Sequence, residues 1–258
     1  MPIYQHFREN EHPFIDRVLD WKIQVENQFI IYVTEFLNPR EREIVRYVIG
    51  EQNAEIDVSF FGGVDKAERQ RAVIAPYFIP IETEHFELVG LEATYPSKFI
   101  TLTHRDVLGA FTSLGIDRKM VGDIFVHPDR IHLITTETFK DYIVQQLTNI
   151  KSTSVSFHEL PLSSIEKIEA QWKKQNYTVS SLRLDVVVRT VYHLSRKNAS
   201  RLIEAERVHL NYRLETNPAT TLEIGDLLSV RGYGRCKLID HRGKTRKDKI
   251  RLLVAHLT

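Results

Sequence analysis

Apolar residues recur at intervals of three and four in two distant parts of the chain. In the first they are Phe14, Val18, Trp21 and Val25, and in the second Leu184, Val187, Val188, Val191 and Leu194. This spacing puts apolar side chains on one face of a helix. The sequence therefore predicts one helix over residues 11–27, with Pro13 tolerated near its start, and another over residues 182–194.

Capping residues predict a further helix near the N-terminus. Asn38 suits the N-cap and Pro39 the first helical position. We expect this helix to run to Ile49 and to end at Gly50. Residues 28–37, which lie between it and the first helix, are also predicted to be helical.

A strand is predicted where apolar and polar residues alternate over residues 56–60. It ends at Gly62-Gly63, after which a helix capped by Asp65 is predicted over residues 65–75. A glycine pair ahead of a helix can bind phosphate through its free backbone N–H groups. Acids in the first turn here stand where the anion would sit, which favours a plain strand-to-helix turn.

Residues 84–160 read as strand, helix, hairpin, helix, strand. The predicted strands lie within residues 86–102 and at 123–126, 131–135 and 154–158, and the predicted helices at 104–114 and 137–147. That order is the split βαβ arrangement, the ferredoxin-like fold of RNA-recognition modules. The aromatic and basic signature on which such modules stack bases is missing from residues 130–135. Base stacking and a scaffold or protein-docking role are therefore both left open.

A second helix follows the apolar helix of residues 182–194. Ser195 is its predicted N-cap, and Ala199, Leu202 and Ile203 form its apolar line. Alternation over residues 208–211 and 227–230 predicts strands, with Asn217-Pro218 and Gly225-Asp226 as turns. Two helices that lean on a small sheet and carry guanidinium groups on one side make a phosphate-binding surface.

These patterns describe an α+β protein. We predict a mostly helical N-terminal α/β domain over residues 1–80, a ferredoxin-like (RNA-recognition-like) βαββαβ domain over 81–160, a linker over 161–180 and a C-terminal αα-β domain over 181–258. The linker is placed where Pro161 begins a polar stretch.

Charge is divided unevenly along the chain. The 35 Lys and Arg nearly balance the 34 Asp and Glu, yet residues 181–258 hold 16 of the first kind against 8 of the second. Residues 1–180 hold the remaining 19 against 26. Only the C-terminal part therefore has the charge of a nucleic-acid-binding surface. The acidic body either keeps that binding selective or faces a protein partner, and both are left open.

Composition argues against several other classes of protein. No apolar run is long enough to span a membrane, and the polar N-terminus does not resemble a secretion signal, so we expect a cytoplasmic protein. The single cysteine, Cys236, excludes an internal disulfide and a multi-cysteine zinc site. No His-Glu-x-x-His motif occurs among the 11 histidines, so we expect no metal and no cofactor.

The candidate RNA-binding residues are the cations of the C-terminal part and the cap of its second helix. They are Arg183, Ser195, Arg196, Lys197 and Arg201 from the helices, and Arg231, Arg235, Lys237, Arg242, Lys244, Arg246, Lys247 and Lys249 from the strands and their loop. We expect them to form one continuous phosphate-binding face. A merely solvated loop over residues 239–249 is the alternative.

The same stretch resembles the S-four RNA-binding domain, named for a small-subunit ribosomal protein. The matching residues are Arg183-Leu184-Asp185, Ser195-Arg196, Ala199, Leu202-Ile203, Val208, Asn211 and Gly225-Asp226. The family usually has glycine where this chain has Glu206 and Tyr212. Both are turn positions, so we expect distorted turns, and Glu206 puts an anion near the expected RNA face.

Nearly the whole chain is similar to the YlmH family of S-four proteins. The supporting stretches are Phe60-Phe61-Gly62-Gly63 with Ala67-Glu68-Arg69, His104-Arg105-Asp106-Val107-Leu108-Gly109-Ala110 with Leu114-Gly115-Ile116 and Gly122-Asp123-Ile124, and Ser180-Ser181-Leu182-Arg183-Leu184-Asp185 with Gly232-Tyr233-Gly234-Arg235. The resemblance implies an RNA-binding protein that engages the large ribosomal subunit with a tRNA-linked nascent chain during quality control after stalling. Its expected partners are thus rRNA, tRNA and the large subunit. The family is also tied to cell division.

Enzyme functions find little support in the motifs. Arg183-Leu184-Asp185 resembles the catalytic aspartate motif of pseudouridine synthases, but it begins a helix of a small basic module, where Asp185 is expected to cap or to pair with an arginine. Gly243-Lys244-Thr245 lacks the glycine that a P-loop needs five residues earlier. We therefore expect no catalytic residue. The alternative function is that of a cell-division scaffold that also binds RNA. An RNA-modifying enzyme is a less favoured alternative.

Overall fold

A computed structural model describes residues 3–7, 9–50 and 55–257 of the chain. The chain is an α+β protein with two compact units, Met1–Ile168 and Glu169–Thr258. None of the helices in the described ranges is long and apolar enough to cross a membrane.

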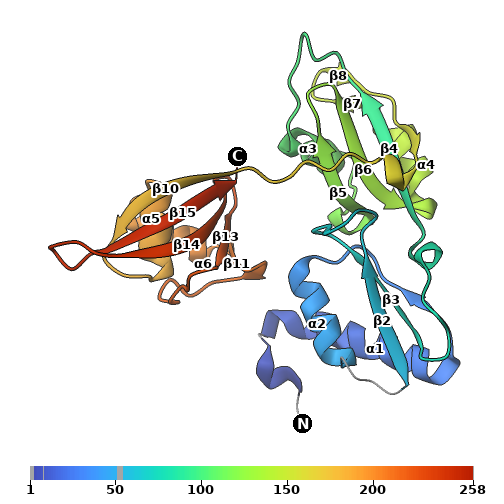
Figure 1. The fold of residues 1–258 in the computed structure, drawn as a ribbon, viewed down its shortest axis with the longest axis horizontal. Coiled ribbons are helices and arrows are strands. Elements are labelled where there is room, and N and C mark those ends of the chain that lie inside the picture. Colours follow the sequence, from blue (N-terminus) through green and yellow to red (C-terminus); the bar gives the residue numbers. More distant parts are fainter. Residues whose placement is uncertain (1–2, 8, 51–54, 258) are drawn as a thin grey trace. The chain divides into compact units, whose positions relative to one another are not determined.

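The N-terminal part of the first unit packs two helices on one face of a small antiparallel sheet (Figure 1). The elements are η1 (Ile3–His6), η2 (Glu9–Glu11), α1 (His12–Gln28), β1 (Tyr32–Val33), α2 (Pro39–Ile49), β2 (Ile56–Phe61) and β3 (Arg71–Pro76), with the strands in the order β1-β3-β2. Ile15 and Val18 of α1 and Val45 of α2 are fully buried in one cluster with Ala72 and Ile74 of β3. This burial of apolar faces is what holds the helices on the sheet.

The predicted start of α2 is confirmed in detail. The Asn38 side chain accepts a hydrogen bond of 3.0 Å from the backbone N–H of Glu41, and the Glu41 carboxylate accepts one of 2.7 Å from the N–H of Asn38. Pro39 occupies the first turn, where its missing N–H costs nothing. Gly50 ends the helix with a positive φ of 89°.

The predicted helix over residues 28–37 is wrong. α1 already ends at Gln28, and the following residues contain β1, in which Tyr32 pairs with Ile74 of β3. The sequence from Ile30 to Thr34 is rich in β-branched residues, which favour a strand when a neighbouring strand is available.

The predicted helix over residues 65–75 is also wrong. A turn follows Gly63, and the chain then forms β3, all six residues of which are buried. The backbone N–H groups of Glu68 and Arg69 donate to the Asp123 carboxylate at 2.7 and 3.0 Å, instead of starting a helix. A Cβ atom on Gly62 would lie 2.3 Å from the carbonyl oxygen of Arg69, so this glycine allows a close crossing of two chain segments. The phosphate-binding turn considered for Gly62-Gly63 therefore has no helix to follow it.

The central part of the first unit has the predicted ferredoxin-like order. Its elements are η3 (Thr83–Phe86), β4 (Leu88–Thr94), α3 (His104–Ser113), η4 (Arg118–Met120), β5 (Val121–Val126), β6 (Arg130–Thr136), α4 (Glu137–Gln146), β7 (Asn149–Ile150), β8 (Thr153–Ser154), β9 (His158–Leu160) and η5 (Leu162–Ser164). The antiparallel sheet has the order β5-β6-β4-β9. The last strand, predicted over residues 154–158, lies instead at His158–Leu160.

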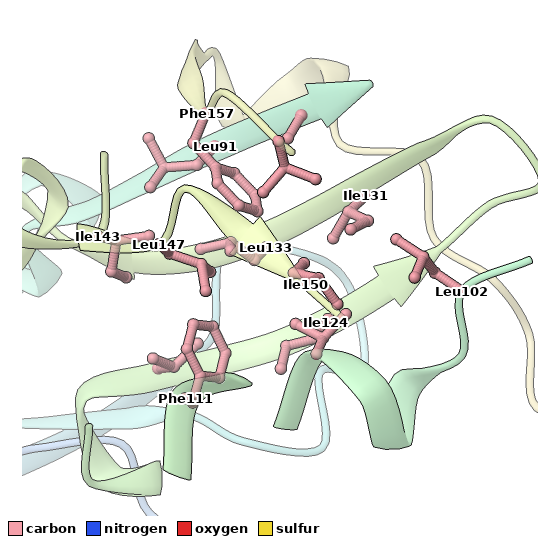
Figure 2. Close-up of a cluster of buried hydrophobic side chains, with 14 of the residues drawn as sticks. Leu91, Leu102, Phe111, Ile124, Ile131, Leu133, Ile143, Leu147, Ile150 and Phe157 are labelled. Carbon is pink, nitrogen blue, oxygen red and sulfur yellow. The ribbon is translucent and has the colours of Figure 1, made fainter. Parts of the chain in front are cut away.

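The helices of this central part cover one face of its sheet. Figure 2 shows Leu91 of β4 and Leu133 of β6 in a cluster with Phe111 of α3 and Ile143 of α4. The short β7–β8 hairpin adds Ile150 to the same core. Such a core fixes the register of the sheet, because a shift by one residue would expose every apolar side chain.

The second unit folds around a six-stranded antiparallel sheet. Its elements are β10 (Trp172–Val179), α5 (Leu184–Val191), α6 (Arg196–Glu204), β11 (Val208–Leu210), β12 (Arg213–Leu214), β13 (Leu227–Val230), β14 (Gly234–Lys244) and β15 (Ile250–Leu257), and the sheet has the order β10-β15-β14-β13-β11-β12. The core joins Val187 and Val188 of α5 and Ile203 of α6 to Leu238 and Val254 of the sheet. Both helices therefore cover one face of it.

The linker predicted over residues 161–180 needs correction. Residues 172–179 form β10, which pairs along its whole length with β15, from Trp172 opposite Leu257 to Val179 opposite Ile250. Tyr177 and Val179 of β10 belong to the core of the second unit. The sequence pattern did not predict this strand because its first half is polar. An edge strand needs little apolar surface.

Candidate nucleic-acid interface

The predicted cap of the second helix is confirmed. The Ser195 side chain accepts a hydrogen bond of 3.2 Å from the backbone N–H of Asn198, and its extended backbone starts α6. The apolar face of α6 buries Ala199 and Ile203. Arg196, Lys197 and Arg201 are consequently turned to solvent, and all three are exposed.

Three arginines from two helices meet at one pocket. Arg183 precedes α5, Arg189 lies near its end and Arg196 begins α6. These residues line a pocket of about 320 Å³ together with Ser180, Ser181, Asp185 and Val186. All three arginines are exposed. Guanidinium groups around a pocket suit phosphate oxygens, to which they donate hydrogen bonds.

Arg189 was not among the candidates from the sequence. The sequence does indicate that Arg189 is exposed, because position 189 falls outside the apolar line of Val187, Val188 and Val191. Only the fold brings it to the same pocket as Arg183 and Arg196.

The predicted pairing of Asp185 with an arginine is confirmed. Arg183 donates from Nε and Nη2 to the two carboxylate oxygens of Asp185, at 3.0 and 3.2 Å. Burial of the carboxylate opposes its charge, but the hydrogen bonds from Arg183 and from the Val186 N–H outweigh this, so the pKa of Asp185 lies below its ordinary value. A carboxylate held in this way orients Arg183, and it also lines the pocket.

The expectation of one continuous face is wrong for two residues of β14. Cys236 and Leu238 are fully buried in the core beneath the helices. Neighbouring residues of a strand point to opposite faces, so Arg235 and Lys237 lie on the face of the sheet away from α5 and α6. Arg235 stands 5.6 Å from the ring centre of Tyr212, and its positive charge adds to burial in lowering the pKa of His209.

A third group of cations lies on the hairpin between β14 and β15. The pairing of the two strands continues to Lys244 opposite Ile250, and Figure 1 shows the hairpin extending beyond the rest of the sheet. Lys244 lies 2.7 Å from the Asp248 carboxylate, and Arg242 3.8 Å from that of Asp240. The exposed cations of the group are Arg242, Lys244, Arg246, Lys247 and Lys249. Arg231 is exposed in the turn between β13 and β14, so it is not part of this hairpin.

The turns that lack the family's glycines keep the glycine conformation. Glu206 has a φ of 59° and Tyr212 a φ of 66°, both in the left-handed region. Asn211, next to Tyr212, has a φ of 51°. Its side chain stabilises the turn by donating a hydrogen bond of 2.8 Å to the Asp226 carboxylate. The expected distortion is therefore absent. Glu206 and Tyr212 adopt the left-handed conformation at an energetic cost that glycine would not have, because their Cβ atoms crowd the backbone.

The face of the central sheet that could stack bases is covered. Ile131 and Leu133 of β6 point toward the helices, so His132 and Ile134 point to the opposite face. Ile134 packs there with Phe36 and with Ile165. Residues 162–166, here called the strap, thus lie over the platform on which RNA-recognition modules stack bases.

Hydrogen bonds fix the strap to the sheet. The backbone N–H of Glu166 donates to Nδ1 of His132 at 3.0 Å, so the other ring nitrogen donates to Glu92 at 2.7 Å. This bond from His132 lowers the pKa of Glu92. His132 is only 1% exposed, so the central sheet offers no open stacking surface at β6.

The helix side of the central part has a larger pocket, of about 590 Å³. It is lined by Arg105, Asp106, Gly109, Ala110, Ser113, Leu114, Gln146, Thr148, Asn149 and Lys151. Lys151 forms an ion pair of 2.9 Å with Asp106, and Arg105 leaves the lining with a net formal charge of +1. In the part of the chain that the structure describes, no three His, Cys, Asp or Glu side chains are grouped to hold a metal ion.

Comparisons with known families match all three parts of the chain. Residues 10–78 match the family described as the N-terminal domain of YlmH, and residues 81–164 match the putative RNA-binding domain in YlmH. Residues 182–228 match the S4 domain, which is the S-four RNA-binding domain. The S4 match includes α5, α6 and β11, and it leaves out β10, β14 and β15.

Two relatives extend the comparison. The chain is 38% identical over 250 residues to the Ribosome-associated protein quality control protein P2 of Bacillus subtilis (strain 168), a match that covers 97% of this chain and 96% of that protein. The structure is similar to that of the cell division protein ylmH from Streptococcus pneumoniae, with a TM-score of 0.54 and 30% identity, covering 64% of this chain and 99% of the other. The chain therefore belongs to the YlmH family of S-four RNA-binding domain proteins.

Proposed function

We propose that this protein binds structured RNA on the large ribosomal subunit and that its second unit makes the main contact. The observation that carries the proposal is the pocket at which Arg183, Arg189 and Arg196 meet on the helices of the S-four domain. The name of the Bacillus subtilis relative, a ribosome-associated quality control protein, supports the ribosome as the place of action. A ribosomal role would put the protein in the cytoplasm.

The geometry suits a folded RNA better than a flexible strand. The three arginines come from segments held by a common core, so the positions of their backbones are fixed before RNA binds. A fixed set of cations matches phosphates that are themselves held in a fixed arrangement, as in rRNA and tRNA. The ligand proposed for this surface is accordingly rRNA together with a tRNA that carries a nascent chain.

The hairpin between β14 and β15 would act in addition. Arg246, Lys247 and Lys249 on the hairpin are exposed and can reach phosphates away from the pocket. On a duplex each phosphate contact releases about 0.9 counterion, so several contacts give an affinity that falls steeply with salt.

The test is a charge reversal on α6. In the double variant Arg196→Glu, Arg201→Glu, we expect cosedimentation with ribosomes to be lost while the unfolding midpoint stays near that of the wild type. The matched control is Lys98→Glu, which reverses an exposed cation in a loop of the first unit and should leave binding unchanged. Undiminished cosedimentation of the double variant would refute the proposed role of these arginines.

The name of the Streptococcus pneumoniae relative favours a second candidate, a scaffold at the division site. A scaffold would bind its partner through the acidic body, so the same α6 variant would keep its location in the cell. Under the ribosomal proposal, the variant instead loses its association with ribosomes. Imaging and gradient fractionation of one strain separate the two candidates.

A further inference from the structure

Large apolar side chains are exposed together at one corner of the first unit. Phe29 is 63% exposed, Ile30 40%, Tyr77 63% and Phe78 56%. The ring centres of Phe29 and Phe78 lie 6.1 Å apart, and those of Tyr77 and Phe78 5.4 Å. These four residues, here called the aromatic corner, form one contiguous patch from two distant parts of the sequence. Such patches on protein surfaces mark interaction sites, whereas single exposed apolar residues do not.

The backbone holds the aromatic corner in place. Phe29 ends α1 with a left-handed φ of 54°, and its N–H donates to the carbonyl of Val25 at 3.0 Å. β1 and β3 pair Tyr32 with Ile74, which brings the chain before β1 beside the chain after β3. The N–H of Tyr77 donates to the carbonyl of Glu55 at 3.0 Å. The backbone that carries the exposed rings is therefore held in place. Ordering the rings when a partner binds would cost little conformational entropy.

The surroundings of the aromatic corner are acidic. Residues 23–39 and 72–97, which contain its four residues, hold six Asp and Glu and no Lys or Arg. Glu84 is exposed on the second of these stretches, and Glu55, whose backbone carbonyl accepts the hydrogen bond from Tyr77, is exposed as well. An RNA backbone or an anionic lipid surface would be repelled from such a region, whereas a cationic partner would be attracted.

We propose that the aromatic corner docks a basic protein segment, one in which lysine or arginine residues flank apolar side chains. The rings would bury the apolar side chains, and the acids would pair with the flanking cations at the rim. The proposal rests on the proposed ribosomal function, because proteins that lie on rRNA carry such segments. It divides the work between the units: the second binds RNA and the first binds protein on the same particle.

The test measures the affinity of the full-length chain for purified large ribosomal subunits. The aromatic variant Tyr77→Ser, Phe78→Ser is expected to weaken binding about tenfold, as loss of central aromatic contacts does at other interfaces. The charge variant Glu55→Lys should weaken it about threefold at low salt. The control is Phe99→Ser, which removes a ring that is 89% exposed outside the aromatic corner and should have no effect.

The sign of the charge effect separates the two classes of partner. If the aromatic corner lay against RNA, Glu55→Lys would tighten binding, and that result would overturn the proposal. Unchanged binding of the aromatic variant would also overturn it. Failure of the proposed function has a different signature, since the α6 double variant would then bind as well as the wild type whatever the aromatic corner does.

A photo-crosslinker gives the second measurement. Benzoylphenylalanine at position 78 of the full chain, irradiated on purified large subunits, should link to a protein through a segment rich in lysine or arginine. Links to rRNA alone, or no link under conditions where the chain cosediments, would contradict the proposal.

Discussion

Arg183 holds the carboxylate of Asp185 through two parallel hydrogen bonds, although the arginine itself remains exposed at the edge of the pocket. The side chain of Asp185 is only 5% exposed. The buried acid therefore fixes the direction of the exposed base, in a sequence that also matches the opening of the S-four pattern. The Arg183-Leu184-Asp185 motif, which resembles that of a catalytic aspartate, thus forms an ion pair that positions Arg183.

The first prediction concerns this pair. Asp185→Asn keeps the shape but removes the charge, and we expect it to destabilise the protein by about 1 to 2 kcal/mol, the usual cost of losing hydrogen bonds to a buried charged group. Chemical denaturation measures this loss. Mass spectrometry of RNA nucleosides should show no product with the wild type or with Asp185→Asn, and a modified nucleoside that only the wild type makes would restore the enzymatic interpretation.

The same pair gives a dependence on pH. The pKa of Asp185 is lower in the folded protein than in the unfolded chain, so its contribution to stability is present above the unfolded pKa, near 4. It disappears as the pH falls through the lower, folded value. The difference in unfolding free energy between wild type and Asp185→Asn should therefore shrink on acidification below pH ~4, and a difference that grows there would contradict the assignment.

The second prediction concerns Arg189, which the sequence did not single out. Arg189→Ala should weaken RNA binding at all sequences and reduce the slope of log affinity against log salt by about 1, as expected for the loss of one phosphate contact. Filter binding of tRNA across a salt series measures the slope. Lys98→Ala is the matched control on the acidic unit.

The third prediction concerns the left-handed turn at Glu206. Glycine takes this conformation without strain, so Glu206→Gly should stabilise the protein by roughly 0.5 to 1 kcal/mol. Arg201→Gly, in the middle of α6, should instead destabilise it by about 1 kcal/mol. Denaturant midpoints of the two variants should move in opposite directions, and a shared direction would show that the turn is unstrained.

The fourth prediction uses two glycines of the central part. A Cβ on Gly90 would lie 2.6 Å from the carbonyl oxygen of Leu160 and 2.9 Å from Ile165 of the strap, so Gly90→Ala should cost about 1 to 3 kcal/mol. Gly109, inside α3, has no neighbour within 4 Å of such an atom, and Gly109→Ala should stabilise by about 0.5 to 1 kcal/mol. Thermal unfolding measures both, and a harmless Gly90→Ala would mean that the strap is not packed on the sheet.

Local chemistry was enough to predict several elements. Asn38, Pro39 and Glu41 fixed the start of α2, Ser195 fixed the start of α6, and in both cases the deciding hydrogen bonds run between residues three apart. The order of elements over residues 84–160 was likewise predictable, because each element has its own clear period.

Long-range contacts explain the errors. The stretch at Glu68 looks like a helix start, but its N–H groups bind Asp123, more than fifty residues away in sequence. β10 has a polar first half and becomes a strand only because β15 is beside it. The position of Arg235 on the far face of the sheet follows from the burial of Cys236, which the sequence did not specify. Such contacts depend on the whole fold, and local patterns do not encode them.

The pairing of β10 with β15 also has a consequence for synthesis. Trp172 leaves the ribosome early and has no neighbour on the sheet until Leu257 follows. Closing so long a loop is slow, because its entropy is lost before the contacts form. The second unit should thus stay incomplete during most of its own translation, and a chain that stalls before β15 would present α5 and α6 on an unfinished sheet.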